Sequence, residues 1–499
     1  MTASSFIQKG VNAATQGNLT EAEFCFRQAF LLAKKENRRF NLGGANLIRL
    51  LHQQNQHNKV ASIVEELGIG QALKLPQICI LMAAESTLKA HQNNLSENLY
   101  SSLHAQYPQE KSVVLGFSQI LLKLGKLDQA KETLEDYVLK HGINAEVASN
   151  LAVIELEQGD LQAAEVNYRR ASSLAPEKFV THYNLGKYLQ MHGGLDEAMS
   201  EFNMCLEIVP TATEAMIAKA ETLTRKGQDN ESREMYLKIL EGNAMNKEQS
   251  VAIFKPLIAD AIEQVDWDTC KQYLSKLSDE IRSDFRLKTI IYDLPKELQN
   301  EFGDGTGLYD ARKLVDSKNF IDDPEYLERI TQNVVMNKTL IKDRPEKPTR
   351  GGRQTHEIMG SNSNELDTLK ADLESELIKY ANGLPQSIKP IEGSKFSVSG
   401  WAVSLESGGH QLRHSHPEAV VSGVLYLSIP TDMNKSNDDK QGSLYFSNGK
   451  GKPEEESMHI KPTQGKLVMF PSYIPHETIP FESAKERISL AVNLIQIKG

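Results

Sequence analysis

Residues 159–176 read GDLQAAEVNYRRASSLAP, and residues 193–210 read GGLDEAMSEFNMCLEIVP. The two stretches begin 34 residues apart, and each carries small and apolar residues at the same positions. The same spacing relates a series of glycines: Gly125, Gly159, Gly193 and Gly227. A fixed period of this length is typical of a helical repeat array, in which each unit packs on its neighbours.

Further columns of residues follow in phase with these glycines. One column is small, and the other is mostly apolar: Ala130, Ala164, Ala198 and Ser232, then Tyr137, Ala171, Cys205 and Ile239. Each unit predicts two amphipathic helices joined by a glycine turn, with the small residues allowing close approach. Pro176 and Pro210 are expected to end the second helix of their units, because proline cannot continue a helix.

The repeat extends toward the N-terminus with a weaker pattern. Residues 17–30 (GNLTEAEFCFRQAF) carry the same small-residue column out of phase, whereas residues 40–110 are helical with a degenerate repeat signal. Around Gly186, YNLGKY together with the small residues and the closing prolines resembles the tetratricopeptide repeat (TPR). The resemblance implies a groove that holds a protein or peptide partner. We expect the array over residues 1–245, clearest over 109–244, followed by a helical cap or linker over 246–305.

The composition changes after residue 305. Residues 346–365 (EKPTRGGRQTHEIMGSNSNE) are rich in Gly, Pro, Ser and Asn, which favour loops. One more helix is expected over 365–382. Short alternating strands follow: KFSVSGWAVSL, VVSGVLYLSI, GSLYFS, KLVMFP and ISLAVNLIQI. Strands at this spacing predict a β-sandwich or open barrel over residues 306–499. The predicted fold class is therefore multidomain α + β, an α-helical solenoid followed by a β-domain.

Histidine is concentrated in this β-domain. His414 and His416 lie two residues apart just before a strand, so both can point to one side, as can His416 and Glu418. His476 follows the strand KLVMFP, and Arg487 begins the last strand. Imidazole and carboxylate ligands suit Fe(II), and three ligands on one face leave positions open. The spacing therefore predicts a metal site with His414 and His476 as ligands.

The order of these blocks resembles a known family. HSHPEAVVSGVLYLSIP, GSLYF, GKLVMFPSYIPHETIP and ERISLAVNL, preceded by TRGGRQT, are similar to the double-stranded β-helix (jelly roll) of 2-oxoglutarate/Fe(II)-dependent dioxygenases. They are most similar to a bacterial and phage branch that is often fused to TPRs. The resemblance implies Fe(II), 2-oxoglutarate, O2 and ascorbate as reductant, with hydroxylation of a protein or peptide side chain. Arg487 is then expected to pair with the 2-oxoglutarate carboxylate, and Tyr426 and Asn493 to contact 2-oxoglutarate or substrate.

One position departs from the wider superfamily, which uses His-x-Asp or His-x-Glu. The third ligand is either His416, giving three imidazoles, or Glu418. This departure keeps two other functions open, a catalytically inactive TPR scaffold and a three-histidine, cupin-like metal enzyme that does not use 2-oxoglutarate. His410 and His459 are interpreted as solvated histidines, and Trp401 as a core residue.

The bulk composition narrows the remaining classes of function. A formal net charge of −10 over 499 residues argues against general binding to nucleic acid or to anionic membranes. The four cysteines, Cys25, Cys79, Cys205 and Cys270, are widely spaced and predict buried thiols rather than a disulfide framework. Without a signal-like N-terminus or a long apolar run, the sequence predicts a cytoplasmic protein.

Overall fold

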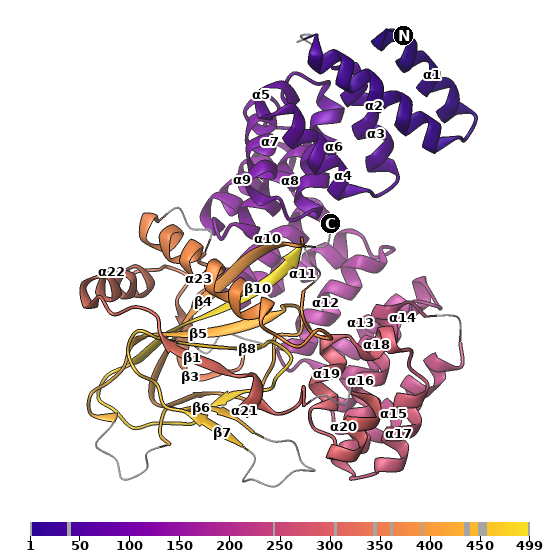
Figure 1. The fold of residues 1–499 in the computed structure, drawn as a ribbon. Coiled ribbons are helices and arrows are strands. Elements are labelled where there is room, and N and C mark those ends of the chain that lie inside the picture. Colours follow the sequence, from indigo (N-terminus) through magenta and orange to yellow (C-terminus); the bar gives the residue numbers. More distant parts are fainter. Residues whose placement is uncertain are drawn as a thin grey trace. The chain divides into compact units, whose positions relative to one another are not determined.

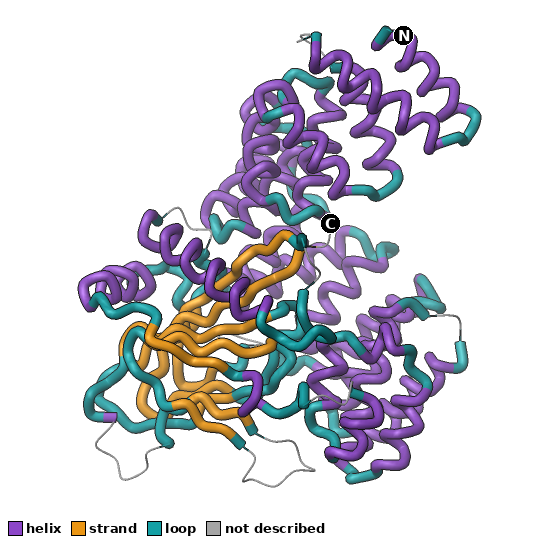
Figure 2. The backbone as a smooth tube through the Cα atoms, viewed as in Figure 1, coloured by secondary structure: helices purple, strands orange, loops and turns teal. Residues whose placement is uncertain are grey.

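The computed structural model describes residues 2–36, 41–242, 245–303, 307–342, 347–359, 363–390, 393–433, 440–447 and 457–497. The chain divides into two compact units, Met1–Ala171 and Ser172–Lys498. Helices form the described part of the first unit and the first part of the second, and the strands follow them (Figures 1 and 2). The predicted domain boundaries near 245 and 305 remain predictions, and residues 244 and 304–306 lie outside the described residues.

The first unit consists of helices that pair along the chain. They are α1 (Ala3–Thr15), α2 (Leu19–Lys35), α3 (Leu42–Gln53), α4 (His57–Leu67), α5 (Ile69–Ala72), α6 (Gln77–Lys89), α7 (Asn93–Gln106), α8 (Lys111–Lys123), α9 (Leu127–His141), α10 (Ala145–Gln158) and α11 (Leu161–Leu174). The last turn of α11 belongs to the second unit.

Helices also open the second unit. They are α12 (Phe179–Met191), α13 (Leu195–Ile208), α14 (Thr213–Arg225), α15 (Asp229–Leu240), α16 (Lys247–Glu263), α17 (Trp267–Ser275), α18 (Asp279–Arg282), α19 (Phe285–Ile291), α20 (Lys296–Phe302), α21 (Ala311–Leu314), α22 (Pro324–Val335) and α23 (Asn364–Asn382). Pro176 and Pro210 each lie two residues beyond the end of a helix, as the sequence predicts.

The repeating glycines lie in the turns between paired helices. Gly125, Gly159, Gly193 and Gly227 have φ values between 70° and 88°. The same turn position is occupied by residues other than glycine at Asn55 (φ 56°), His91 (φ 58°) and Val265 (φ 58°); asparagine and histidine adopt positive φ more readily than most, whereas the β-branched valine rarely does. The degenerate stretch from 40 to 110 therefore contains two further helical hairpins, and α16 and α17 form another.

Small residues on the first helix of a pair face large ones on the second. A Cβ atom at Gly186 would lie 2.7 Å from the ring of Phe202, and one at Gly10 would lie 2.6 Å from the ring of Phe26. The small-residue column predicted from the sequence lies on the second helix of each pair and is buried as well: Ala130, Ala164, Ala198 and Ser232 are at most 3% exposed. This close approach explains why the period is visible in the sequence.

The strands form two antiparallel sheets (Figure 2). They are β1 (Asp316–Asn319), β2 (Ile341–Lys342), β3 (Thr349–Gln354), β4 (Lys395–Gln411), β5 (Val421–Ser428), β6 (Leu444–Phe446), β7 (Met458–Ile460), β8 (Lys466–Pro471), β9 (Glu477–Thr478) and β10 (Arg487–Ile497). The larger sheet has the order β1-β8-β5-β10-β4-β3-β2, and the smaller has the order β7-β6-β9.

The pairing register assigns the residues of the larger sheet to two faces. Ala402, Leu490 and Leu425 lie side by side on one face, and helix α23, whose buried leucines repeat at helical spacing, packs against this sheet. Trp401, Ala491 and Val424 lie side by side on the other face. We call this second face the inner face. Alternation along β10 places Arg487, Ser489 and Asn493 on it as well.

A single apolar core joins the late helices to the sheet. Buried side chains of the α14–α20 region begin this core, and it continues into the strands of the larger sheet; the helical members include Ile217, Tyr236, Leu257, Leu274 and Ile291. The α16–α20 helices therefore share buried side chains with the β-region. No described helix is long and apolar enough to span a membrane.

Candidate metal centre and comparison with known proteins

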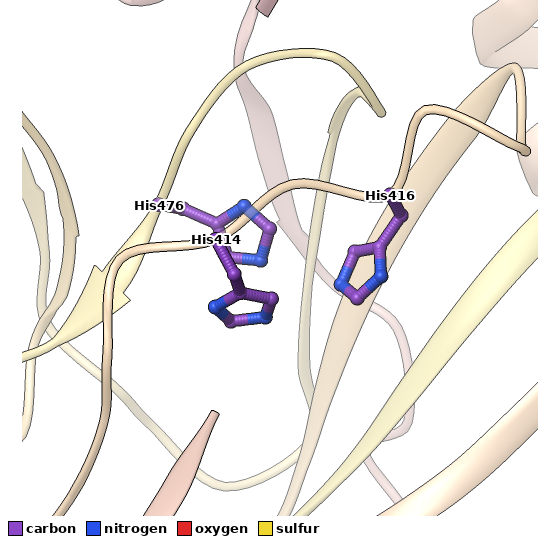
Figure 3. Close-up of side chains that lie close together, drawn as sticks. All are labelled: His414, His416 and His476. Carbon is purple, nitrogen blue, oxygen red and sulfur yellow. The ribbon is translucent and has the colours of Figure 1, made fainter. Parts of the chain in front are cut away.

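Three histidines converge beside the larger sheet. The nitrogen atoms that His414, His416 and His476 can offer to a metal all lie within 4.8 Å of one another, and Figure 3 shows the three rings gathered from two segments of backbone. The ring centroids of His414 and His476 are 4.3 Å apart. We refer to His414, His416 and His476 as the histidine triad.

Backbone hydrogen bonds hold the two segments together. The amide of His414 donates to the carbonyl of His476 (3.0 Å), and the amide of His476 donates back to His414 (2.9 Å). The His416 amide donates to the carbonyl of Ser472 (2.9 Å), and the Ser472 amide donates to Val420 (3.2 Å). The 414–420 and 472–476 segments therefore run beside each other, which the sequence spacing alone did not predict.

Carbonyl groups orient two of the imidazoles. Nδ1 of His414 lies 2.7 Å from the carbonyl of Leu412, and Nδ1 of His476 lies 3.1 Å from the carbonyl of Ile474. A carbonyl only accepts, so each Nδ1 carries the proton and each Nε2 retains a lone pair. This arrangement is the one that metal-binding histidines use to fix ring orientation.

Burial keeps the triad neutral. Loss of hydration lowers the pKa of His414 to about 4, and the same effect, reinforced by His414 and Lys347, lowers the pKa of His416 to about 3. Burial and the other two imidazoles hold the pKa of His476 well below its usual range. All three rings therefore have lone pairs available at neutral pH.

Glu418 lies apart from the triad. Its side chain is 62% exposed, and its Oε1 lies 3.8 Å from Nδ1 of His416, beyond hydrogen-bond distance. Among the described histidine, cysteine and acidic side chains, the triad is the group of three whose ligand atoms converge, and Glu418 is not part of it.

Aromatic rings surround the triad. The ring of Phe470 meets His476 at 4.6 Å between centroids, and the ring of Trp401 meets His416 at 5.3 Å. Trp401 is half-buried on the inner face and packs against the buried cluster that contains Val403 and Phe481, so its assignment to the core agrees in part with the structure. His459 also differs from the expected solvated residue, because its half-buried ring stacks on Tyr445 with centroids 4.4 Å apart.

A buried cation lies on the same face of the sheet. Arg487 is only 2% exposed, and its Nε and Nη1 atoms have no hydrogen-bond partner among the described residues. Its guanidinium carbon lies 5.0 Å from the centroid of Tyr426, whose buried hydroxyl likewise makes no hydrogen bond of normal geometry within the described part of the chain. Burial lowers the pKa of Arg487, and the neighbouring Tyr426 opposes this shift.

Asn493 lies further along β10 on the inner face. It is buried, and its Oδ1 accepts a hydrogen bond of 2.8 Å from the hydroxyl of Ser422. Tyr426 and Asn493 thus both lie on the inner face, whereas no hydrogen bond between them and the triad is observed among the described residues.

The sequence comparison bears on this same region. Residues 399–493 match the model of a family described as "Putative 2OG-Fe(II) oxygenase". The matched residues include the whole triad, Arg487 and Asn493. The C-terminal region therefore matches the 2OG-Fe(II) oxygenase family. No curated protein matches the sequence significantly.

Solved structures resemble the two parts of the chain. A Pseudomonas putida prolyl-4-hydroxylase is 19% identical and aligns over 38% of this chain and 97% of its own, with a TM-score of 0.29. A tetratricopeptide repeat protein from Parabacteroides merdae is 12% identical over 58% of this chain and 98% of its own, with a TM-score of 0.37. YrrB, described as a TPR protein with an unusual peptide-binding site, is 18% identical over 36% and 91%, with a TM-score of 0.27.

The predicted 2OG-Fe(II) oxygenase domain is confirmed by the family match over residues 399–493, and the helical hairpins that precede it agree with the predicted repeat array. The predicted multidomain α + β fold class is confirmed as well, since helical hairpins precede a region of antiparallel sheets.

Proposed function

We propose that this protein is a 2-oxoglutarate- and Fe(II)-dependent dioxygenase in which the histidine triad holds the iron. The observation that carries the proposal is the combination of three converging neutral imidazoles with a buried guanidinium whose Nε and Nη1 atoms have no hydrogen-bond partner among the described residues. Three imidazole nitrogens suit Fe(II) and leave coordination positions for other molecules. His416 is preferred to Glu418 as the third ligand, because Glu418 is directed to solvent.

Arg487 fits the distal carboxylate of 2-oxoglutarate. Burying a guanidinium whose N–H groups lack acceptors is costly, so a site that retains one is suited to an anionic ligand. A carboxylate would accept from Nε and Nη1 together in the forked geometry that arginine favours. The Tyr426 hydroxyl beside it would donate a further hydrogen bond, and Asn493 lies on the same face.

Bound iron would activate O2 as the oxidant, and 2-oxoglutarate, on conversion to succinate and CO2, would supply two of the electrons that O2 takes up, the substrate supplying the other two. The residues of the chain would bind the iron and 2-oxoglutarate and orient them. The Leu412 and Ile474 carbonyls orient the imidazoles of His414 and His476, and the rings of Phe470 and Trp401 pack against His476 and His416.

The substrate in this proposal is a protein or peptide side chain that the TPR array presents, and the expected reaction is hydroxylation. Stacked helical hairpins form extended surfaces that suit an extended peptide or a partner helix. The family match supports the oxygenase class and leaves the choice of substrate to experiment.

Succinate release tests the proposal. The full-length protein, supplied with Fe(II), ascorbate, 2-oxoglutarate and O2, is expected to release succinate, and His476→Ala is expected to abolish it. His410→Ala is the matched control, because His410 is a half-buried histidine of β4 outside the triad. A wild-type protein that bound no iron and released no succinate would contradict the proposal and favour the inactive scaffold.

The absence of a carboxylate from the triad, among the described residues, also favours a second candidate, a three-histidine metal enzyme that does not use 2-oxoglutarate. The two candidates differ at Arg487. Substitution of Arg487 by Ala weakens turnover of 2-oxoglutarate only if this side chain binds it. An iron-dependent oxidation that proceeds without 2-oxoglutarate, and that Arg487→Ala leaves unchanged, would support the second candidate.

A further inference from the structure

Helix α19 presents one face to the two segments that carry the histidine triad. Phe285, Thr289 and Asp293 are spaced four residues apart, so they lie in line on one side of the helix and its continuation. Each of the three contacts the segments that carry the triad. Helix α19 precedes both the region matched by the family model, residues 399–493, and the β-domain expected from the sequence.

The Thr289 hydroxyl lies between the two segments. Its Oγ1 is 3.0 Å from the carbonyl of Tyr473 and 3.2 Å from the hydroxyl of Ser415. Ser415 lies between His414 and His416, and Tyr473 lies three residues before His476. The Thr289 Oγ1 also lies 3.0 Å from the carbonyl of Phe285, so its one hydrogen is shared between the Phe285 and Tyr473 carbonyls. The oxygen can accept from Ser415 in either case, and when the hydrogen is donated to Tyr473 the hydroxyl connects the two segments directly.

Phe285 and Asp293 contact the same segments on either side of Thr289. The ring of Phe285 packs edge-on against the buried ring of Tyr473 with centroids 5.1 Å apart, and the Tyr473 hydroxyl donates to the carbonyl of Leu308. Asp293 pairs with both terminal nitrogens of Arg413, the residue before His414; one of these contacts, Nη1 to Oδ2, measures 3.0 Å.

From these contacts we propose that α19 positions the histidine triad, with Thr289 as the positioning residue that couples the 414–416 and 472–476 segments. The helical region of the second unit then supplies part of the support of the metal centre. Its relevance to metal binding rests on the proposed function, whereas the coupling of the segments does not.

Hydrogen–deuterium exchange of the metal-free, full-length protein tests the coupling. Thr289→Val keeps the side-chain shape and removes the hydroxyl, and amides in residues 412–416 and 472–476 are expected to exchange about fivefold faster, as for loss of one hydrogen bond. Thr289→Ser restores the hydroxyl and is expected to restore slow exchange. Thr331→Val is the control, because Thr331 is also half-buried and bonds a carbonyl four residues back, in α22.

Equal exchange of these segments in Thr289→Val and Thr331→Val would overturn the proposal. Titration with Ni²⁺ or Fe(II) gives a second readout, in which Thr289→Val is expected to bind about tenfold more weakly, in the range found for outer-shell partners of metal ligands. A wild-type protein without metal affinity would contradict the proposed function alone, because the exchange result decides the role of Thr289 independently.

Discussion

Arg487 shows how one buried side chain constrains function. Its Nε and Nη1 atoms lack partners among the described residues, although the guanidinium is almost wholly buried. The sequence singled out this residue from its position at the start of the strand that follows His476 and from the resemblance to the dioxygenases. Trp401 lies on the inner face too, yet its contact with His416 depends on the fold of the 414–420 segment and could not be read from spacing.

Substitution of Arg487 by Lys is expected to raise the KM for 2-oxoglutarate by about 10- to 100-fold, because a forked pair of charge-assisted hydrogen bonds is lost. Iron affinity should be unchanged. Arg353→Lys is the control, since Arg353, on strand β3, pairs with Glu486, the residue before Arg487. Steady-state kinetics of succinate release measure the effect, and an unchanged KM would argue against 2-oxoglutarate at Arg487.

The triad predicts a pH dependence of the metal-free protein. The pKa values of His414 and His416 are depressed in the folded state, so the unfolded chain binds more protons once the pH falls below about 6.5. Stability should therefore be lost as the pH falls from about 6.5 toward 4, by up to about 1.4 kcal/mol per pH unit for each histidine.

Urea unfolding of wild-type protein and His416→Gln at several pH values between about 7 and 5 measures this contribution. The variant is expected to lose less stability over the same range, because one buried imidazole no longer titrates on unfolding. Identical pH slopes would show that His416 is accessible to protons in the folded state. Saturating Ni²⁺ should shift the wild-type loss to lower pH, because metal and protons compete for the same nitrogens.

At the scale of elements, the residue in each interhelical turn determined whether that helical hairpin could be recognised from the sequence. Glycine occupies the turn in four units of fixed period, and these were found from the sequence. Asn55 and His91 replace glycine in two hairpins between residues 40 and 110, so that stretch lacked its strongest signal although its helices pair in the same way. The strands were predicted from alternation, whereas the support from α19 arises from tertiary packing alone.

Val265 is strained in the turn between α16 and α17. It has φ 58° and is 59% exposed, so a β-branched side chain adopts this costly conformation without the benefit of burial. Val265→Gly is expected to stabilise the second unit by about 1 kcal/mol, the cost of left-handed backbone less the entropy of glycine. Val209→Gly, an exposed valine at a helix end with φ −133°, should destabilise it. Chemical denaturation ranks the two, and a destabilised Val265→Gly would contradict the reasoning.

Alanine substitutions at two glycines of the first unit would distinguish the effect of packing on stability from the effect of helix propensity. A Cβ atom at Gly116 would lie 2.3 Å from the buried ring of Tyr100, whereas one at Gly70 would meet nothing within 4 Å. Gly116→Ala is expected to cost about 1–3 kcal/mol through overpacking, and Gly70→Ala is expected to gain up to about 1 kcal/mol. Thermal or urea unfolding distinguishes them, and a stabilised Gly116→Ala would mean that α7 and α8 separate without cost.

At the scale of the whole molecule, the core of the second unit is continuous. Buried side chains of α16–α20 and of the larger sheet belong to one apolar cluster. The sequence predicted a helical cap followed by a β-domain, and periodicity gives no sign that the two share a core, because each pattern reports only its own element. The helices before the sheet therefore contribute to the stability of the region that carries the triad.

Leu274→Ala tests this continuity, because Leu274 is fully buried in α17, an element outside the sheet. In a Trp267→Phe background, the fluorescence of Trp401 reports on β4 alone. Leu274→Ala is expected to lower the free energy of unfolding seen by Trp401 by about 2–5 kcal/mol. Leu121 is buried in the first unit, so Leu121→Ala should leave the unfolding transition reported by Trp401 unchanged. If Leu274→Ala left the unfolding transition reported by Trp401 unchanged, the helices and the sheet would not unfold as one cooperative unit.

The four cysteines provide the protein with its own reporters of opening. Cys25 and Cys79 are buried in the first unit, and Cys205 and Cys270 are buried in the second. Burial raises the pKa of Cys205 to about 12 and that of Cys270 to about 11, so neither thiol reacts readily while it is enclosed. Brief exposure to an alkylating reagent, followed by peptide mass analysis, would therefore measure how fast the buried thiols of each unit become accessible, without any change to the sequence.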